Sequence, residues 1–472
     1  MAPERSSPLP PLNVADLVTV DLESEAETCS STTSLNVHVV HNVQDEQTKQ
    51  LAPPAELTSC VETSCCYKKC RRRRGTKSFC HPETRDMKTF INTFIAFLGS
   101  GVLGLPYAFR QTGIVTGLVT LGSVAALSTY AMLLVLQCKY KLEQDGKRVT
   151  TYGAIGQVAL GPLGSFLVNT ALVISQTGFC IAYLIFIASN AQKIFNLSQP
   201  VVVFMCVPPL VGFSLLKHMR QLAYVSVVAD LMCIVGLLVV LQIDLTYMET
   251  DDDAIQVVGL TSGIPFFFGI ASYCFEGVGL VLPLEQSMQH KRHFTPILVS
   301  TVIIITSLYA TFGICGYLAF GNETNAIITL NLDASGVAGT LVQLCLCLGL
   351  FFTYPVMLYP VFEVVQSIAL CKTLHHSPSS RRTDVAVRAS IVLCTAIIAA
   401  TIPDFGRFIS FIGSTCCALL AFILPAWFHL CLFRKDAMTW KDRVHQLVVC
   451  AMMAVGLAMF CAGVIEAIQC VL

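Results

Sequence analysis

From residue 87 onward, apolar residues gather in long runs that short polar segments separate. A helix needs about 20 apolar residues to cross a hydrocarbon core about 30 Å thick, and most of these runs reach that length. The pattern predicts eleven membrane spans, the ninth being the shortest: 89–110, 114–138, 163–189, 199–216, 221–243, 259–284, 295–320, 336–366, 388–403, 405–431 and 446–469. We therefore expect an all-α integral membrane protein.

Residues 1–86 have a different composition, rich in Ser, Thr, Pro and Glu and without a sustained apolar period. Such a segment cannot bury enough apolar surface to offset its ordering entropy, so we expect a disordered cytosolic tail ahead of a transmembrane domain over 87–472. No secretory signal peptide is expected in it. The basic run at 68–74 is typical of the cytosolic flank of a membrane helix. Three cysteines beside this run are candidates for palmitoylation, a zinc site or no modification: Cys65, Cys66 and Cys70.

Composition agrees with a membrane location. Apolar residues make up 54% of the chain and charged residues 13%, against about 25% charged in soluble domains. The 30 basic and 30 acidic residues balance, which excludes a strongly basic nucleic-acid binder. Of the 22 cysteines, 16 lie in or beside apolar runs, where a free Cys acts as a small apolar residue. A disulfide scaffold is not expected.

Charge predicts the orientation of the spans. With a cytosolic N-terminus, 27 of the 30 Lys and Arg residues fall in cytosolic segments, and only Arg110, Lys193 and Arg407 lie on the far side. This is the positive-inside bias of membrane proteins, and it places the C-terminus in the lumen or outside the cell. The two N-x-[ST] sequons, at Asn196 and Asn322, both fall in far-side loops, where glycosylation is expected.

Helix-weakening residues mark the centres of the first and sixth spans. In lipid, a helix break is tolerated only where it is buried in protein or lines a watery cavity. Close packing through small residues is the alternative explanation. However, the two spans each begin one of two five-span halves of opposite direction, which is typical of secondary transporters with a site near the midplane. The weakening residues are Gly99, Gly101, Gly104, Pro106, Pro265, Gly269, Gly277, Gly279 and Pro283.

Four segments resemble the amino acid/auxin permease family, and within it the plant-type vacuolar amino-acid transporters and the proton-coupled amino acid transporters. They are LGSGVLGLPYAFRQTG, CFEGVGLVLPLE, FFTYPVMLYPVFEVV and FISFIGSTCCALLAFILPAWFH. They occur in the family's order, and the resemblance covers about 87–432. It implies a leucine-transporter-like fold, with a 5+5 inverted repeat plus one helix and with helices 1 and 6 broken. It also implies proton-linked transport of amino acids by alternating access, in a vacuolar or lysosomal membrane.

The residue types at the two breaks suit an amino-acid zwitterion. A break at Gly99-Ser100-Gly101 leaves N–H groups at the start of a half-helix, which is a carboxylate site. A break around residues 272–277 leaves the carbonyl groups of Ser272, Tyr273 and Phe275 to accept from an ammonium group. The expected pocket carries no charge, which favours small neutral amino acids such as alanine or proline: Tyr107, Gln176, Phe179, Tyr273, Phe275 and Phe411.

Acidic residues inside the spans are the candidates for ion coupling. A charged group at mid-bilayer costs about 2.5–3.5 kcal/mol on insertion scales, so its presence indicates function. Asp230 and Glu276 are the coupling candidates, since a carboxyl group removed from water retains its proton more readily. Glu285 and Glu363 lie near cytosolic helix ends and are expected to have gating or structural roles. Glu466 lies on the last helix, where a structural role is expected.

The resemblance favours protons over sodium as the driving ion. A sodium site would draw on oxygen ligands such as those of Asn92, Thr93 and Thr353. No cofactor or metal is expected. The expected partners are the amino acid, protons and membrane lipids, without nucleic acid.

Three alternatives remain at this stage: a membrane enzyme, a channel, and a nutrient-sensing transceptor at the plasma membrane. An enzyme is disfavoured because the chain has no GxSxG, HExxH or Walker sequence. The histidines at 290, 293, 375 and 376 lie in basic loops, where a solvated surface is expected.

Overall fold

The computed structural model describes residues 90–471, apart from 92, 96, 216–218, 248–254, 260, 289, 333–335, 374–380 and 435–438. The chain divides into two units, 1–77 and 78–472, and all described residues belong to the second. The expected tail, with its basic run and its three cysteines, therefore lies outside the described residues.

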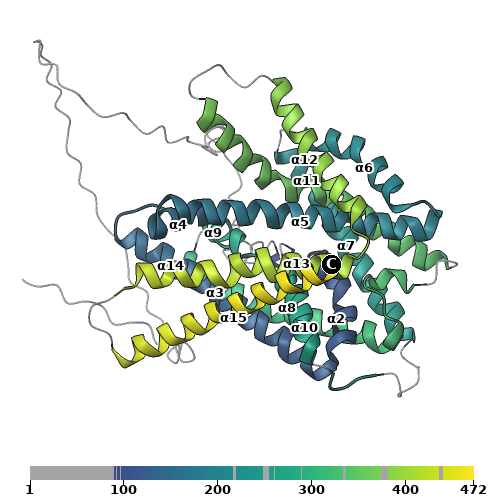
Figure 1. The fold of residues 1–472 in the computed structure, drawn as a ribbon, viewed down its shortest axis with the longest axis horizontal. Coiled ribbons are helices and arrows are strands. Elements are labelled where there is room, and N and C mark those ends of the chain that lie inside the picture. Colours follow the sequence, from purple (N-terminus) through teal and green to yellow (C-terminus); the bar gives the residue numbers. More distant parts are fainter. Residues whose placement is uncertain are drawn as a thin grey trace, which may run out of the picture. The chain divides into compact units, whose positions relative to one another are not determined.

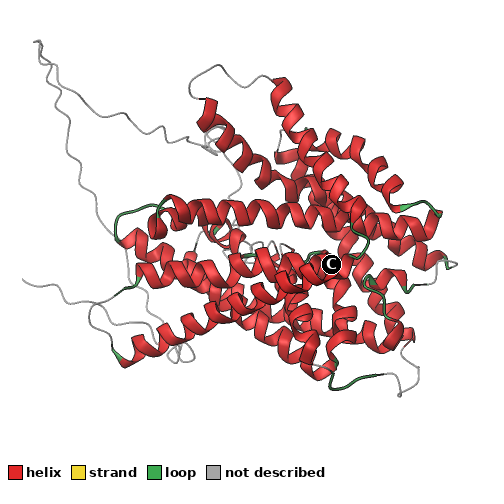
Figure 2. Cartoon of the chain, viewed as in Figure 1, coloured by secondary structure: helices red, strands yellow, loops and turns green. Residues whose placement is uncertain are grey.

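Every regular element among the described residues is a helix (Figure 2). The long elements of Figure 1 are Leu105–Thr112 (α2), Ile114–Gln144 (α3), Tyr152–Leu160 (α4), Pro162–Phe195 (α5), Gln199–Ser214 (α6), Met219–Tyr247 (α7), Ile264–Cys274 (α8), Val278–Ser287 (α9), Phe294–Phe320 (α10), Val337–Thr373 (α11), Arg381–Thr401 (α12), Phe405–Ile412 (α13), Leu424–Leu432 (α14) and Trp440–Val471 (α15). Short 3₁₀ helices are Ser100–Gly104 (η2), Gly321–Glu323 (η6) and Ile328–Leu330 (η7), and two π-helical turns are Gly413–Cys417 (η8) and Leu419–Ile423 (η9).

Nine helical segments among the described residues are long and apolar enough to cross a membrane. The segment 264–287 counts as one of them and comprises α8 and α9, and 405–432 comprises α13, η8, η9 and α14. The apolar helix α6 is shorter. The fold is therefore all-helical, as expected, while the number of eleven crossings stays a prediction.

Several helices extend beyond the apolar runs that predict them. Helix α3 continues to Gln144, so Lys139 lies in a helix and not in a cytosolic loop, and its side chain is buried. Helix α7 continues to Tyr247, beyond the predicted span end at 243, so Asp244 is also helical, and it is fully buried. Both positions correct the sequence boundaries. The reason is that helical hydrogen bonding does not require apolar side chains, so a helix persists beyond the hydrocarbon layer.

The centre of the described unit is formed by three helical segments. Their most apolar windows are 78% buried in α5, 78% in α8–α9 and 83% in the segment 405–432, against 22% in α15. Helix α15 packs along α14 and the π-helical turns, on the outside of this core (Figure 1). The segment 264–287, which comprises α8 and α9, is thus enclosed by other helices. A break in a membrane helix is tolerated only when it is buried in protein in this way or lines a watery cavity.

Helix α8 crosses the 405–432 segment at two glycines. A Cβ atom at Gly413 would overlap the backbone carbonyl of Gly269, and one at Gly269 would overlap the backbone of Ser410. The Ser410 hydroxyl also donates to the carbonyl oxygen of Phe266 (3.0 Å). Small residues allow the two backbones to touch, as in other membrane helix pairs. The π-helical turn η8 begins at this crossing.

Candidate functional site

Helical structure is interrupted just before η2. Phe97 is the last helical residue before the interruption, Leu98 and Gly99 are non-helical, and Gly99 is extended (φ −107°, ψ 179°). The hydroxyl group of Tyr309 on α10 donates to the carbonyl oxygen of Phe97 at 2.5 Å. This bond satisfies one carbonyl group that the interruption removes from the helical pattern. The interruption at 98–99 begins three residues ahead of Gly101, which lies inside η2.

A second interruption separates α8 from α9. Helix α8 ends at Cys274, α9 begins at Val278, and Gly277 has an extended φ of −162° with ψ at 2°. Ser272 and Tyr273 lie in the last turn of α8, so the interruption begins after them. Glu276 lies within it. The last carbonyl groups of α8 therefore end beside an acidic side chain.

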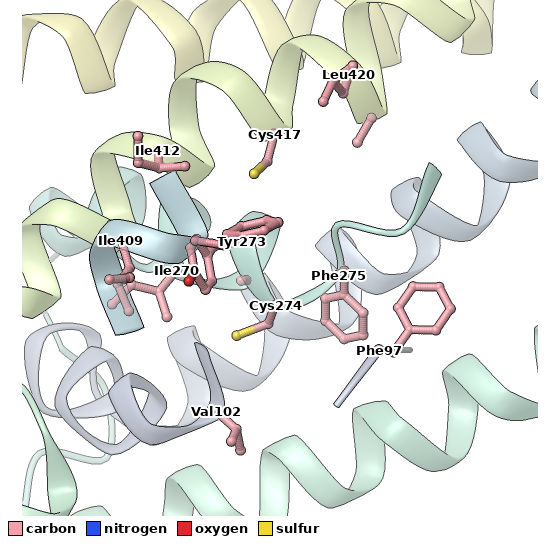
Figure 3. Packing of buried hydrophobic residues seen from close by; sticks show 14 of the residues in the cluster. Phe97, Val102, Ile270, Tyr273, Cys274, Phe275, Ile409, Ile412, Cys417 and Leu420 are labelled. Carbon is pink, nitrogen blue, oxygen red and sulfur yellow. The ribbon is translucent and has the colours of Figure 1, made fainter. Parts of the chain in front are cut away.

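The two interruptions contact each other directly. The hydroxyl groups of Ser100 and Tyr273 form a hydrogen bond of 3.1 Å. A Cβ atom at Gly101 would lie 2.6 Å from Sγ of Cys274 and 2.7 Å from the Tyr273 ring, so glycine allows this approach. At the other end of the contact, the ring of Phe97 occupies the space beside Gly277. Figure 3 shows Tyr273 and Cys274 together, with Phe97 beside Phe275.

A cavity of about 470 Å³ opens beside this contact. Its walls come from both interruptions and from α5, α7, α9 and α11. Of the described residues that line it, none is Lys, Arg or His. Seven of the residues singled out from the sequence line it together: Gly99, Ser100, Gln176, Phe179, Asp230, Glu276 and Thr353.

The cavity thus contains two carboxyl groups. Glu276 is 8% exposed, and its Oε1 has no hydrogen-bond partner among the described residues. Asp230, on α7, lines the same cavity. An unpaired buried carboxylate such as that of Glu276 is costly, so this group gains by taking up a proton or a cation.

Six of the residues expected to bind substrate lie outside the cavity lining. Gly101 and Ser272 are buried within helices, and Tyr273 is held by Ser100 and by an edge-on contact with Phe179 (4.5 Å between centroids). Tyr107 packs edge-on against another ring, that of Phe266, at 5.7 Å. Phe275 is buried against Tyr309 with 5.5 Å between ring centroids.

Phe411 also lies outside the cavity lining. It is 38% exposed on α13. The other expected helix-breaking residues lie next to or inside helices: Gly104 ends η2, and Pro106 lies in the first turn of α2, where its missing N–H carries no cost. Gly279 and Pro283 lie inside α9, which continues through both.

The wall from α11 was not anticipated from the sequence. It supplies six lining residues and includes Pro355 and Pro360 within the helix. A proline removes a helical hydrogen bond and marks a local irregularity, so the segment FFTYPVMLYP contained a usable signal. Helices α5 and α7 add four more unanticipated residues: Tyr183, Val227, Cys233 and Leu237. The lining residues from α11 are Leu346, Leu350, Thr353, Val356, Met357 and Pro360, of which only Thr353 was anticipated.

Of the two described residues considered as sodium ligands, Thr353 lines the cavity and Thr93 does not. Asn92 lies outside the described residues. Thr93 is fully buried, and the Thr353 hydroxyl donates to the carbonyl oxygen of Gly349 on its own helix (2.9 Å). Two further acids lie away from the lining, with Glu363 exposed on α11 and Glu466 partly buried on α15.

Glu285 belongs to a buried ionic cluster. Its carboxylate accepts from the ammonium group of Lys139, from the Tyr140 hydroxyl (3.2 Å) and, at 3.5 Å, pairs with Lys291. Glu285 and Lys139 are 0% and 1% exposed, whereas Glu143, which also pairs with Lys139 at 3.6 Å, is 38% exposed. This cluster joins α3 to the end of α9, as expected for a structural or gating role of Glu285.

We expect Glu285→Ala to destabilise the protein by about 3–5 kcal/mol, because it leaves the buried ammonium group of Lys139 without its main partner. Glu143→Ala is the matched control, since it removes an exposed partner of the same lysine and should cost no more than about 1 kcal/mol. Thermal unfolding of both variants in detergent measures the difference. Equal stability of the two variants would show that burial of the pair is unimportant.

The three cations on the far side of the charge pattern all have partners. Arg110 donates to the carbonyl oxygen of Thr324 (2.9 Å). The Lys193 ammonium donates to the carbonyl oxygens of two residues of the same loop, Leu330 (2.7 Å) and Leu332 (2.5 Å). Arg407 pairs with Asp404 at 3.1 Å. Arg110 and Lys193 thus hold the loop that contains η6 and η7.

Comparison with known proteins shows the family. The family described as "Transmembrane amino acid transporter protein" matches residues 84–469. The chain belongs to this family. Amino acid transporter AVT3B of Arabidopsis thaliana is 38% identical over 385 residues, which are 77% of this chain and 88% of the relative. Vacuolar amino acid transporter 3 of Saccharomyces cerevisiae is 27% identical over 393 residues, covering 80% of this chain and 56% of the relative.

A solved structure shares the fold. MHP1, a nucleobase-cation-symport-1 family transporter in a closed conformation with bromovinylhydantoin bound, aligns with a TM-score of 0.51 at 13% identity, over 81% of this chain and 90% of that chain. The protein is therefore a multi-pass amino acid transporter with an all-helical fold and leucine-transporter-like structural neighbours, and the family resemblance found in the sequence is confirmed. Its relatives are transporters, not enzymes.

Proposed function

We propose that this amino acid transporter carries small neutral amino acids together with protons, by alternating access of the cavity to the two sides of a vacuolar or lysosomal membrane. The cavity carries the proposal, because both helix interruptions and both carboxyl groups, Asp230 and Glu276, line it. The proposed architecture has eleven crossings, with the first and sixth helices interrupted at this cavity. The vacuolar name of the yeast relative supports the location.

Complementary charge at the interruptions supports a zwitterionic substrate. The helical run formed by η2 and α2 begins at Ser100 and directs its first N–H groups toward the interruption, where a substrate carboxylate is stabilised. The last carbonyl groups of α8, with Glu276 beside them, suit the ammonium group. The Ser100–Tyr273 hydrogen bond keeps the two half-sites together.

The remaining wall supports a neutral side chain. Apart from its few polar groups, the lining is apolar, as with Leu98, Val102 and Leu350, and it offers no cation to an acidic substrate. Its volume of about 470 Å³ admits a small amino acid with some water. We expect unlabelled lysine and glutamate to compete poorly with labelled alanine.

Proton coupling follows from the two carboxyl groups. When Glu276 or Asp230 takes up a proton, the cavity loses one negative charge. Closure of the cavity then no longer removes that charge from water, so protonation favours closure. One pH unit supplies about 1.4 kcal/mol per proton, and 100 mV of membrane potential adds about 2.3 kcal/mol. These two sources suffice for substantial accumulation.

Uptake into proteoliposomes tests the proposal. Labelled alanine or proline is supplied outside vesicles, with and without an acid-outside pH gradient and with a protonophore as control. We expect uptake that requires the gradient and collapses with the protonophore. Uptake that does not respond to the pH gradient but requires sodium would show that sodium, and not the proton, is the coupling ion. Equal uptake of lysine or glutamate would overturn the substrate class.

The proposed orientation, with a cytosolic N-terminus, makes a prediction about glycans. Asn196 follows α5 three residues after Lys193, and Asn322 lies in η6, so both exposed side chains lie at the end held by the 321–332 loop. We expect Asn196→Gln and Asn322→Gln each to remove one glycan, seen as a smaller shift after glycosidase treatment. The exposed Asn325, in the same loop but outside a sequon, is the control, because Asn325→Gln should change nothing. Absence of any glycan on the wild type would contradict this orientation.

A further inference from the structure

A third buried carboxyl group lies outside the cavity, at Asp244 in the last turn of α7. Its side chain is 0% exposed, and neither carboxyl oxygen has a hydrogen-bond partner among the described residues. One turn later, the ring of Tyr247 lies 6.0 Å from that of Phe320, which precedes η6. Asp244 is thus near the end of the molecule that bears the 321–332 loop, which we term the outer end. It is not among the residues that line the cavity.

Three helices meet at this carboxyl group. A Cβ atom at Gly316 of α10 would lie 3.3 Å from Oδ2 of Asp244 and 2.7 Å from Cγ of Pro106. Asp244 on α7, Gly316 on α10 and Pro106 on α2 therefore share one contact point. Pro106 lies in the first turn of α2, immediately after η2 and the first interruption.

The ionisable groups of these helices leave Asp244 without a counter-charge. On α10, Cys315 faces Asp244, and the Tyr317 hydroxyl accepts from the backbone N–H of Gln256 at 2.9 Å. On α2, the Arg110 guanidinium is bonded to the Thr324 carbonyl and lies over the Tyr107 ring at 5.5 Å. Among the described residues, no side chain or backbone group forms a hydrogen bond with either carboxyl oxygen of Asp244. An ionised carboxylate here would be desolvated and unpaired, so this arrangement requires the neutral acid.

We propose that Asp244 is a second proton-binding site, which α2 covers when the outer end is closed and exposes when it opens. The inference rests on the proposed proton-coupled alternating access, and it adds that α2, which follows the first interruption, is the element that moves. Exposed to water, Asp244 loses its proton at neutral pH, and the ionised form opposes closure because closing would bury it. Closure of the outer end therefore requires a proton to return. The acidity of the outer compartment thereby sets how readily the transporter closes, independently of the acids in the cavity.

Alanine counterflow at equal pH on both sides of the vesicles tests this inference. The wild-type rate should fall as the pH rises from about 6 to about 8, since the protonated fraction of an exposed carboxyl group, which closure requires, falls about tenfold per unit. In Asp244→Asn the side chain cannot ionise, so the fall should be smaller by about tenfold or more. Asp244→Glu, which still titrates, should keep the wild-type profile. Identical profiles for the wild type and Asp244→Asn would overturn the proposal.

A chemical probe provides a test that needs no variant at this position. Dicyclohexylcarbodiimide adds to protonated carboxyl groups in apolar surroundings, and mass spectrometry of peptides locates the adduct. In the wild type we expect labelling of Asp244 at about pH 5.5 and its loss at about pH 8.5, where the exposed group is ionised. Absent labelling, or equal labelling at both values, would contradict the inference even if Asp244→Asn fails to fold. Gradient-driven alanine uptake by the wild type would then leave the proposed function intact.

Discussion

Glu276→Gln is expected to abolish pH-driven accumulation of alanine while leaving counterflow measurable. The amide keeps the size and polarity of the side chain but cannot exchange a proton, so the free energy of the gradient no longer reaches the substrate. An accumulation ratio that gains about tenfold per pH unit for one coupled proton should fall to about one. The two measurements are concentrative uptake under an acid-outside gradient and counterflow without a gradient, on the same vesicles.

The matched control is Glu466→Gln. Glu466 is also an acid within a membrane helix, but it lies on α15, away from the cavity lining. Its replacement should leave accumulation unchanged. Asp230→Asn, at the α7 wall of the cavity, should also abolish accumulation while counterflow persists in part. If Glu276→Gln accumulates alanine like the wild type, Glu276 is not a coupling residue, and unchanged accumulation by Asp230→Asn would remove Asp230 in the same way.

Gly413→Ala should strongly destabilise the protein. The added methyl group would overlap the carbonyl of Gly269, which belongs to the backbone of α8 and cannot rotate away. Separating the two segments disrupts packing in the most buried part of the described unit, so we expect a loss of about 3 kcal/mol or more. Thermal unfolding in detergent and the yield of monodisperse protein both measure it.

Gly122→Ala is the control for this prediction. Gly122 also lies inside a helix, but a Cβ atom there would meet nothing within 4 Å. Replacing it should stabilise the protein by roughly 0.5–1 kcal/mol through the better helix propensity of alanine. If Gly413→Ala unfolds at the wild-type temperature, the close crossing of α8 with the 405–432 segment is not what holds the core together.

The helices could be predicted from the sequence because membrane burial imposes long apolar runs. Their ends could not, since the amphipathic turns of α3 and α7 continue the helix past those runs and place Lys139 and Asp244 in buried positions. A charged residue at the edge of an apolar run is ambiguous between a loop and a buried contact. Whether such a residue is buried depends on a partner that can pair with it. The partner of Lys139 is Glu285, which lies 146 residues away in the sequence.

The candidate site could be predicted to the extent that backbone chemistry determines it. The glycines and the nearby acidic residues in the sequence indicated where the cavity lies. Three of the residues singled out in this way, Ser100, Asp230 and Glu276, line it. The direction in which each side chain points could not be predicted from the sequence, because it depends on how the helix is rotated about its axis. Phe411 therefore lies outside the cavity lining. Helix α11 supplies one wall of the cavity, although no charged or glycine-rich pattern in its sequence predicted this role.

The pH inside sodium-free proteoliposomes tests the proton-coupled mechanism most directly. A pH-sensitive dye is trapped in vesicles that contain the wild-type protein, and alanine is then added outside without an imposed gradient. Coupled entry predicts that the interior becomes more acidic as alanine enters, and that Glu276→Gln vesicles show no such change. Entry of labelled alanine without any movement of protons would contradict proton coupling and with it the proposed role of both cavity acids.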